Sequence, residues 1–190
     1  MNRFHRWYCG SARWERALRR GILPWALEDV DLGDDALEIG PGPGLTTDIL
    51  REQVATLTCL EIDPALAAKL RARLAESNVT VTDGDATAMP FPDDSFSGAI
   101  CLTMLHHVPS PEAQDTLLRE TRRVLRPGGT FAGIDSTPSL RWNLAHLFDT
   151  RVPVPPETLP GRLEEAGFEE IVVERSPRGG FRFRARAPSG

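Results

Sequence analysis

Apolar residues recur along the chain with two spacings, and these spacings alternate from segment to segment. Short apolar runs bounded by Gly, Pro or Asp are typical of buried strands. They predict strands beginning at Ala36 and over 56–61, 79–81, 99–102, 130–135, 171–174 and 181–186. Apolar residues three or four positions apart are typical of helices with one buried face. They predict helices that begin at Thr46, after an Asp63 cap and after Ser110, and one over 158–166.

This alternation predicts an α/β fold built on a doubly wound, seven-stranded, mostly parallel sheet. The last two strands are joined around Gly179 and Gly180, so we expect them to form a C-terminal antiparallel hairpin. Aromatic and aliphatic residues at helical spacing predict a helical N-terminal cap. We expect one domain over 1–190, made of the cap (1–30), a core (35–135), an irregular loop (136–157), and a terminal helix and hairpin (158–190).

Composition and charge agree with one domain and disfavour two classes of partner. With 190 residues, 41% of them hydrophobic, the chain is long enough to bury one core. The net charge of −5 gives no general attraction to nucleic acid or to an anionic membrane. No apolar run approaches the length of a membrane span, and the arginine-rich start lacks the apolar region of a signal peptide. These features predict a cytoplasmic protein.

Two sets of residues that could carry binding chemistry are better explained by solvation and packing. Arginines crowd the first and last segments, where a solvated face is favoured over a site for an acidic partner. Cys9, Cys59 and Cys101 stand far apart without the spacing of metal ligands. We therefore interpret the cysteines as reduced packing residues and predict no metal site.

The most informative stretch is ALEIGPGPGLTTDIL at 36–50, where a strand leads into three alternating glycines and then a helix. Gly40, Gly42 and Gly44 allow a turn with positive φ and let a ligand approach the main chain. The helix directs unpaired N–H groups at the same point, which suits a carboxylate or a phosphate. Glu38 places a carboxylate at the mouth of the turn, where it would repel a pyrophosphate and attract an ammonium group. The stretch therefore predicts a site for a zwitterion.

The spacing of these glycines disfavours two common nucleotide sites. A dinucleotide fingerprint requires its third glycine where Leu45 stands, and a P-loop requires a lysine that is missing nearby. A second carboxylate nevertheless indicates that the ligand contains a nucleoside. Glu61 ends a predicted strand 21 positions after Gly40, where doubly wound folds place the acid that accepts both hydroxyls of a ribose.

The segment from Glu38 to Gly44 reads E-x-G-x-G-x-G and resembles motif I of the class I S-adenosylmethionine-dependent methyltransferases. Further landmarks of that family follow in order: the acid Glu61, GDA at 84–86, and RVLRPGG at 123–129. The segment before the fourth strand is similar to the small-molecule branch, except that Ser97 stands where Asp is usual. The resemblance implies S-adenosylmethionine as the cofactor and S-adenosylhomocysteine as its product. It also implies methyl transfer by in-line displacement, which depends mainly on alignment.

By the same resemblance, the cofactor is expected along the carboxyl ends of the first four strands. Glu61 would bind the ribose diol, Asp85 would accept from the adenine amino group, and the N–H of Ala86 would serve a ring nitrogen. Thr46 would donate to the carboxylate of the ligand. The full set of expected cofactor-binding residues is Glu38, Gly40, Gly42, Gly44, Thr46, Glu61, Ile62, Asp85, Ala86 and Met104.

His106 and His107 follow the fourth strand and are the candidate catalytic residues. Either could act as a general base for a phenol or an alcohol, and a hydrogen-bonded structural role is at least as well supported. Neighbouring side chains of a strand point to opposite sides, so at most one is expected to reach the pocket. The loop at 136–157, with Trp142, His146 and Phe148, is expected on the acceptor side. Trp7 and Tyr8 of the cap are candidate pocket walls.

Two alternative functions stay open at this point. A NAD-dependent oxidoreductase shares the strand, the glycines and the distal acid, although its third glycine is missing and the GDA acid is unexplained. A protein that binds S-adenosylmethionine without turnover is compatible with Glu61 and Asp85. Methylation of nucleic-acid bases is disfavoured, because no polar residue followed by Pro-Pro-aromatic occurs after the fourth strand. We predict a small-molecule acceptor that the sequence does not identify, and the oligomeric state is undetermined.

Overall fold

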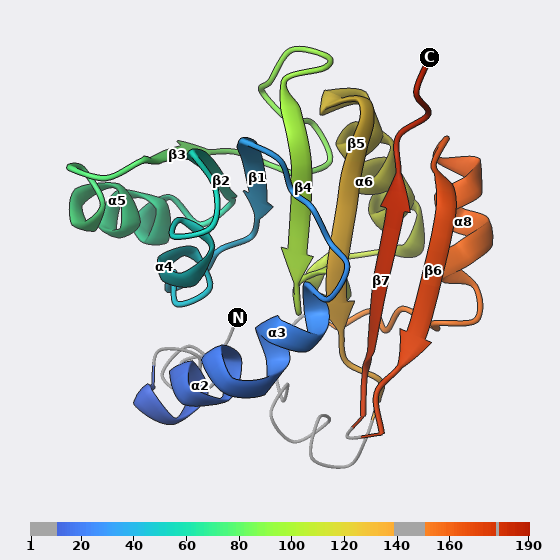
Figure 1. Ribbon diagram of the computed structural model, residues 1–190, viewed down its shortest axis with the longest axis horizontal. Coiled ribbons are helices and arrows are strands. Elements are labelled where there is room, and N and C mark those ends of the chain that lie inside the picture. Colours follow the sequence, from blue (N-terminus) through green and yellow to red (C-terminus); the bar gives the residue numbers. More distant parts are fainter. Residues whose placement is uncertain (1–10, 139–150, 178) are drawn as a thin grey trace.

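The computed structural model of the chain describes residues 11–138, 151–177 and 179–190. Its strands form one seven-stranded sheet in the order β3-β2-β1-β4-β5-β7-β6 (Figure 1). The strands from β3 to β5 pair in parallel, whereas β7 pairs antiparallel with both β5 and β6. The predicted α/β fold, with a doubly wound sheet and a C-terminal hairpin, is therefore confirmed.

All the predicted strands are present, and several are longer than the sequence indicated. Their bounds are β1 (Asp35–Ile39), β2 (Thr56–Glu61), β3 (Val79–Asp83), β4 (Phe96–Leu102), β5 (Leu125–Asp135), β6 (Glu169–Arg175) and β7 (Phe181–Arg186). The largest difference is at β5, which was predicted over 130–135 and begins at Leu125, before the Pro-Gly-Gly segment. Leu125 already pairs with Phe96, and the register then shifts so that Thr130 pairs with Gly98. The Pro-Gly-Gly segment is thus an irregularity within β5, and Gly128 supplies its positive φ of 73°.

Helices cover both faces of the sheet (Figure 1). They are α2 (Ala12–Ala17), the π-helical η1 (Leu18–Ile22), α3 (Leu23–Ala26), α4 (Thr47–Leu50), α5 (Pro64–Arg73), the 3₁₀-helical η2 (Leu105–His107), α6 (Pro111–Val124) and α8 (Leu159–Glu165). The expected caps are present, because Asp63 accepts from Ala65 and Leu66, and Ser110 accepts from Ala113. In the described ranges, no helix combines the length and apolar character needed to cross a membrane.

The first helix after the glycines is short. It was predicted to begin at Thr46, and α4 spans only Thr47–Leu50. The N–H groups of Glu52 and Gln53 bond three residues back, to Ile49 and Leu50, so the chain tightens into turns.

Two apolar cores lie on opposite faces of the sheet. Buried side chains from η1, α3, α4 and α5, such as Leu18, Leu50 and Leu70, fill one of them. Leu117 of α6 and Leu163 of α8 belong to the other. The sheet is therefore the middle of three layers. The strands β4 and β5 run downward in Figure 1, and β1, β2 and β3 pair with them in parallel, so all five end at the same carboxyl edge of the sheet.

Arg182, one of the C-terminal arginines, connects the N-terminal cap to the C-terminal hairpin. Arg182 on β7 forms ion pairs with Glu28 and Glu174 and donates to the Trp25 carbonyl oxygen. Its guanidinium carbon also lies 5.4 Å from the centre of the Trp25 ring. The contacts of Arg182 are therefore structural, and its charge is paired within the protein.

Two of the predicted packing cysteines are buried as expected. Cys59 and Cys101 are free thiols in the cores, and burial is the largest cause that raises the pKa of each. Cys9, Trp7 and Tyr8 lie outside the described residues, as do Trp142, His146 and Phe148 of the loop.

Candidate functional site

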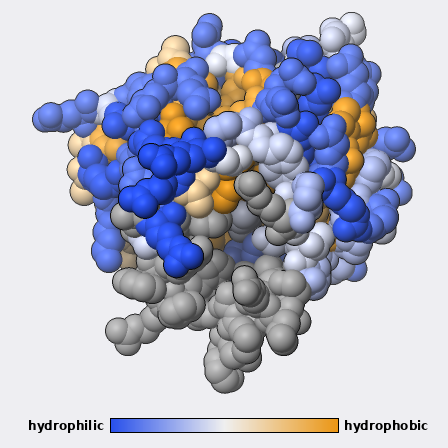
Figure 2. Space-filling model, turned by 60° about the horizontal axis from the view of Figure 1, so that its bottom comes forward, coloured by the Kyte–Doolittle hydropathy of each residue, from blue (hydrophilic) through white to orange (hydrophobic). Residues whose placement is uncertain are grey.

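A cavity of about 360 Å³ opens at the carboxyl edge of the sheet. Its walls come from the turns after β1, β2 and β3, the end of β4, η2, α6 and the cap residue Leu18. Figure 2 turns this edge toward the viewer and shows apolar surface surrounded by polar residues. Volume and lining are typical of a small-molecule site. The predicted residues that line the cavity are Gly40, Gly42, Thr46, Glu61, Ile62, Asp85, Ala86, Met104 and His107.

The three glycines of the turn all have positive φ, but for different structural reasons. A Cβ on Gly40 would lie 2.4 Å from Met104 Cγ, and one on Gly44 would lie 2.4 Å from Leu70 Cδ1. A Cβ on Gly42 would meet no atom within 4 Å. Gly42 therefore presents open main chain to the cavity. Gly44 instead allows close packing against α5 and is outside the cavity lining, contrary to the predicted ligand contact.

Glu38 lies beneath the turn, with its side chain buried. Its Oε1 accepts from the Thr46 hydroxyl, and its Oε2 accepts from the Thr47 hydroxyl at 2.6 Å and from the Cys59 thiol at 3.5 Å. Burial raises the pKa of Glu38, and these hydrogen bonds act in the opposite direction. The expected position at the mouth of the turn is therefore wrong, because the start of α4 covers the carboxylate. The Thr46 hydroxyl, which was expected to donate to the carboxylate of the ligand, donates to Glu38 in this structure.

Glu61 is nearly buried yet lines the cavity. Its Oε2 accepts from the Gly42 N–H and its Oε1 from the Asp63 N–H, both at 2.9 Å. The next residue, Ile62, has an exposed fraction of 66%, which is unusual for a large apolar side chain. A carboxylate and an apolar side chain thus stand together at the rim, where a ribose and a flat base could bind.

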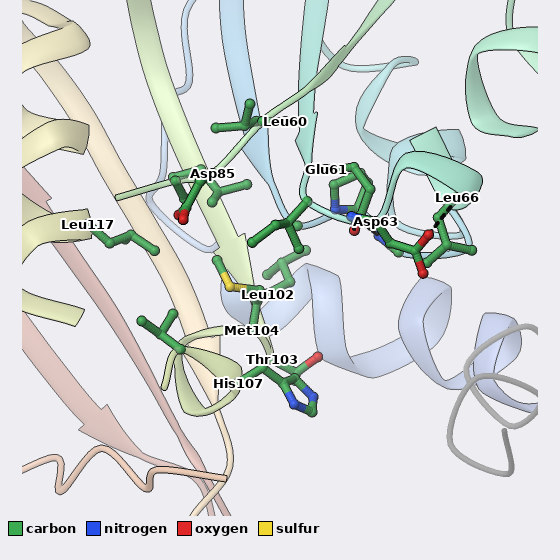
Figure 3. A pocket seen from close by; sticks show the side chains of 18 of the residues that line it. Leu60, Glu61, Asp63, Leu66, Asp85, Leu102, Thr103, Met104, His107 and Leu117 are labelled. Atoms are coloured by element: carbon green, nitrogen blue, oxygen red, sulfur yellow. Dashed lines mark hydrogen bonds between the residues drawn. The ribbon is translucent and has the colours of Figure 1, made fainter. Parts of the chain in front are cut away.

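Asp85 and Ala86 line the cavity in the turn after β3. Asp85 Oδ1 accepts from the Thr87 N–H at 2.8 Å and from the Thr87 hydroxyl at 2.9 Å. Asp85 therefore forms a local turn with its own side chain as well as lining the cavity. Figure 3 shows Asp85 and His107 at opposite ends of the cavity, with Met104 between them.

The two histidines lie in η2 and are directed to different places. His107 lines the cavity, whereas His106 has an exposed fraction of 2%. The Nδ1 atom of His106 lies 2.5 Å from Asp135 Oδ1, and its N–H donates to Asp135 Oδ2 at 3.0 Å. Of the two candidates, the structure brings only His107 to the cavity. His106 instead joins η2 to the end of β5.

Sequence reasoning missed several residues of the cavity. Thr103 lines it next to His107 with a φ of 52°, a left-handed conformation that a β-branched residue rarely adopts. Leu18 of the cap and Leu117 of α6 also contribute. No local signal marks them, because an apolar helical residue has the same spacing whether it faces a core or a cavity. Asp135 does not line the cavity, but its position at the end of a buried strand at the same edge is a signal that could have identified it as a partner of His106.

Comparison with known sequences places the chain in a family. A profile of the family described as "Methyltransferase domain" matches residues 37–133, slightly more than half of the chain. A 2-methyl-6-phytyl-1,4-hydroquinone methyltransferase from Oryza sativa is 30% identical over 156 residues, covering 79% of this chain and 44% of that protein. A probable ribosomal RNA small subunit methyltransferase A from Natronomonas pharaonis is 34% identical over 178 residues, covering 86% and 62%. This chain thus spans less than two thirds of either relative.

Comparison with solved structures supports the same fold. A SAM-dependent methyltransferase from Aquifex aeolicus aligns with a TM-score of 0.77 and 17% identity over 98% of this chain and 99% of that one. At this identity the likeness concerns the fold alone. The family profile covers the glycine turn, Glu61 and the turn after β3, and the sheet has the strand order described above. The chain therefore belongs to the class I S-adenosylmethionine-dependent methyltransferases.

Proposed function

We propose that the chain transfers a methyl group from S-adenosylmethionine to a small-molecule acceptor by in-line displacement. The observation that carries this proposal is the order of groups around one cavity. The open main chain of Gly42, after β1, bonds to Glu61 at the end of β2, and Asp85 and Ala86 follow β3, the next strand along the sheet. This order suits an amino acid, a ribose and an adenine in turn. The sulfonium carries its own activation, so the protein has mainly to align the reactants and exclude water.

The charges of the cavity favour a small-molecule acceptor over a nucleic acid. Its titratable lining residues, within the ranges that the structure describes, are Glu61, Asp63, Asp85 and His107, with no Arg or Lys among them. Nucleic-acid binding depends on cations that neutralise phosphates, and three carboxylates act against it. The relatives named above include methyltransferases of a hydroquinone and of RNA, and the charges of the cavity support the first of these classes.

Thermal unfolding tests the cofactor. S-adenosylmethionine and S-adenosylhomocysteine are expected to raise the melting temperature, since a ligand at about 100 times its Kd stabilises the folded state by about 2.7 kcal/mol. NAD at the same concentration is expected to leave the melting temperature unchanged. Equal or larger stabilisation by NAD would contradict the assignment and favour an oxidoreductase.

Labelled S-adenosylmethionine tests the acceptor. Incubation with a cell extract, separated afterwards into RNA, protein and small molecules, is expected to place the label in the small-molecule fraction. Treatment of the extract with ribonuclease should leave that label in place. Label that appears in RNA and is lost after this treatment would overturn the small-molecule assignment.

Replacement of His107 by Gln tests for a general base once the acceptor is known. For an acceptor with an ionisable hydroxyl, turnover is expected to fall about a hundredfold, at the lower end of the effect of a general base. Affinity for S-adenosylhomocysteine should stay within about threefold, because Gln preserves a polar side chain of similar size. An unchanged rate at saturation would show that catalysis rests on alignment alone.

A further inference from the structure

One carboxylate connects two turns of the cofactor cavity. Glu61 Oε2 accepts from Gly42, in the glycine-rich turn after β1, and Oε1 accepts from Asp63, at the start of α5. The Gly40 N–H also donates to the Leu60 carbonyl oxygen at 2.9 Å. The turn is therefore bonded to two successive residues of β2, Leu60 and Glu61. The protein thus fixes the turn through contacts that are independent of any ligand.

These contacts leave the carboxylate able to bind a ligand as well. A carboxylate offers about four acceptor positions, two on each oxygen. One position on each oxygen of Glu61 is used by a main-chain N–H, and the side chain lines the cavity. A pair of hydroxyl groups can therefore be accepted without loss of either contact to the main chain.

We propose that Glu61 is a positioning residue that fixes the glycine-rich turn, in addition to accepting the ligand. The proposal rests on the proposed function to the extent that S-adenosylhomocysteine is used as the probe. A residue that only bound ribose hydroxyls would tolerate an amide, because hydroxyls can both donate and accept. A residue that holds two main-chain N–H groups would not, because those groups can only donate.

The substitution Glu61→Gln distinguishes binding of the ribose hydroxyls from fixing of the glycine-rich turn. Both oxygens of Glu61 face a main-chain N–H, so the amide NH₂ of Glu61→Gln would face another donor in either orientation. Glu38 provides a contrast within the same turn, because its partners are the hydroxyls of Thr46 and Thr47 and the thiol of Cys59. These groups can reverse from donor to acceptor, so Glu38→Gln is expected to be accommodated better.

The experiment measures the affinity for S-adenosylhomocysteine by titration calorimetry and the exchange of the Gly42 amide hydrogen by NMR. Glu61→Gln is expected to weaken binding roughly ten- to a thousandfold, as much as Glu61→Ala does. Amide exchange, also followed at Asp63, is expected to accelerate at Gly42 or at Asp63 in Glu61→Gln, whichever N–H faces the amide NH₂, and at both in Glu61→Ala. Glu38→Gln should weaken binding less than Glu61→Gln, and the exposed Glu76→Gln serves as the matched control.

Binding of Glu61→Gln within about threefold of the wild type, with unchanged exchange at both Gly42 and Asp63, would overturn the proposal. If Glu61→Gln does not fold, Glu61→Asp replaces it. Asp keeps the charge but is one methylene shorter, so it should lose protection at Gly42 or Asp63, and protection at both would overturn the proposal. If the wild type does not bind S-adenosylhomocysteine, the proposed function fails, while amide exchange still decides the role of Glu61.

Discussion

Replacement of Asp135 by alanine is expected to lower the free energy of unfolding by about 3 to 5 kcal/mol, because three hydrogen-bonding groups lose a buried acceptor at about 1 to 3 kcal/mol each. The carboxylate has an exposed fraction of 0% and lies 2.5 Å from the ring nitrogen of His106. It also accepts from the main-chain N–H groups of His106 at 3.0 Å and Ser136 at 2.6 Å. Alanine leaves all three groups without this acceptor. Urea unfolding measures this loss of free energy, with one common m-value used for the wild type and the variant.

The surface aspartate Asp93 provides the control. It forms an ion pair with Arg123, but its side chain has an exposed fraction of 73%. Asp93→Ala is therefore expected to cost less than about 1 kcal/mol. Equal losses for the two variants would contradict a structural role of the Asp135 network. Because that network joins η2 to β5, Asp135→Ala is also expected to displace His107.

Replacement of Phe131 by alanine is expected to cost about 3 to 5 kcal/mol, because it removes a large side chain from the core and leaves a cavity. Phe131 on β5 is fully buried, and its ring centre lies 5.5 Å from that of Phe168 and 5.1 Å from that of Phe183. It therefore joins the parallel part of the sheet to β7 and to the segment after α8. At about 2 to 4 °C for each kcal/mol, the melting temperature should fall by roughly 6 to 20 °C.

Ile62 gives a comparison in which an apolar side chain is removed from the surface. Its exposed fraction of 66% means that Ile62→Ala should change stability by less than about 0.5 kcal/mol. The same variant should bind S-adenosylhomocysteine more weakly, because the side chain stands at the rim of the cavity. A large loss of stability in Ile62→Ala, or none in Phe131→Ala, would contradict the positions of these side chains.

Local sequence patterns were sufficient to predict the order of the elements and the edge at which the site lies. Apolar runs and helical spacing depend on local periodicity, so every strand was found, although β5 begins earlier than expected. Parallel strands end at a common edge, so residues at strand ends, such as Glu61 and Asp85, could be brought together by reasoning alone. The glycines could be recognised because positive φ is a local requirement.

The burial and the direction of each of these side chains could not be predicted in this way, because both depend on tertiary contacts. Glu38 and Glu61 both belong to strands that reach this edge, yet α4 covers Glu38 and the cavity reaches Glu61. His106 and His107 are neighbours, but Asp135, 29 residues away, holds His106 in the interior while His107 lines the cavity. Contacts between distant segments determine burial, and the local pattern of apolar and polar residues contains no record of those contacts.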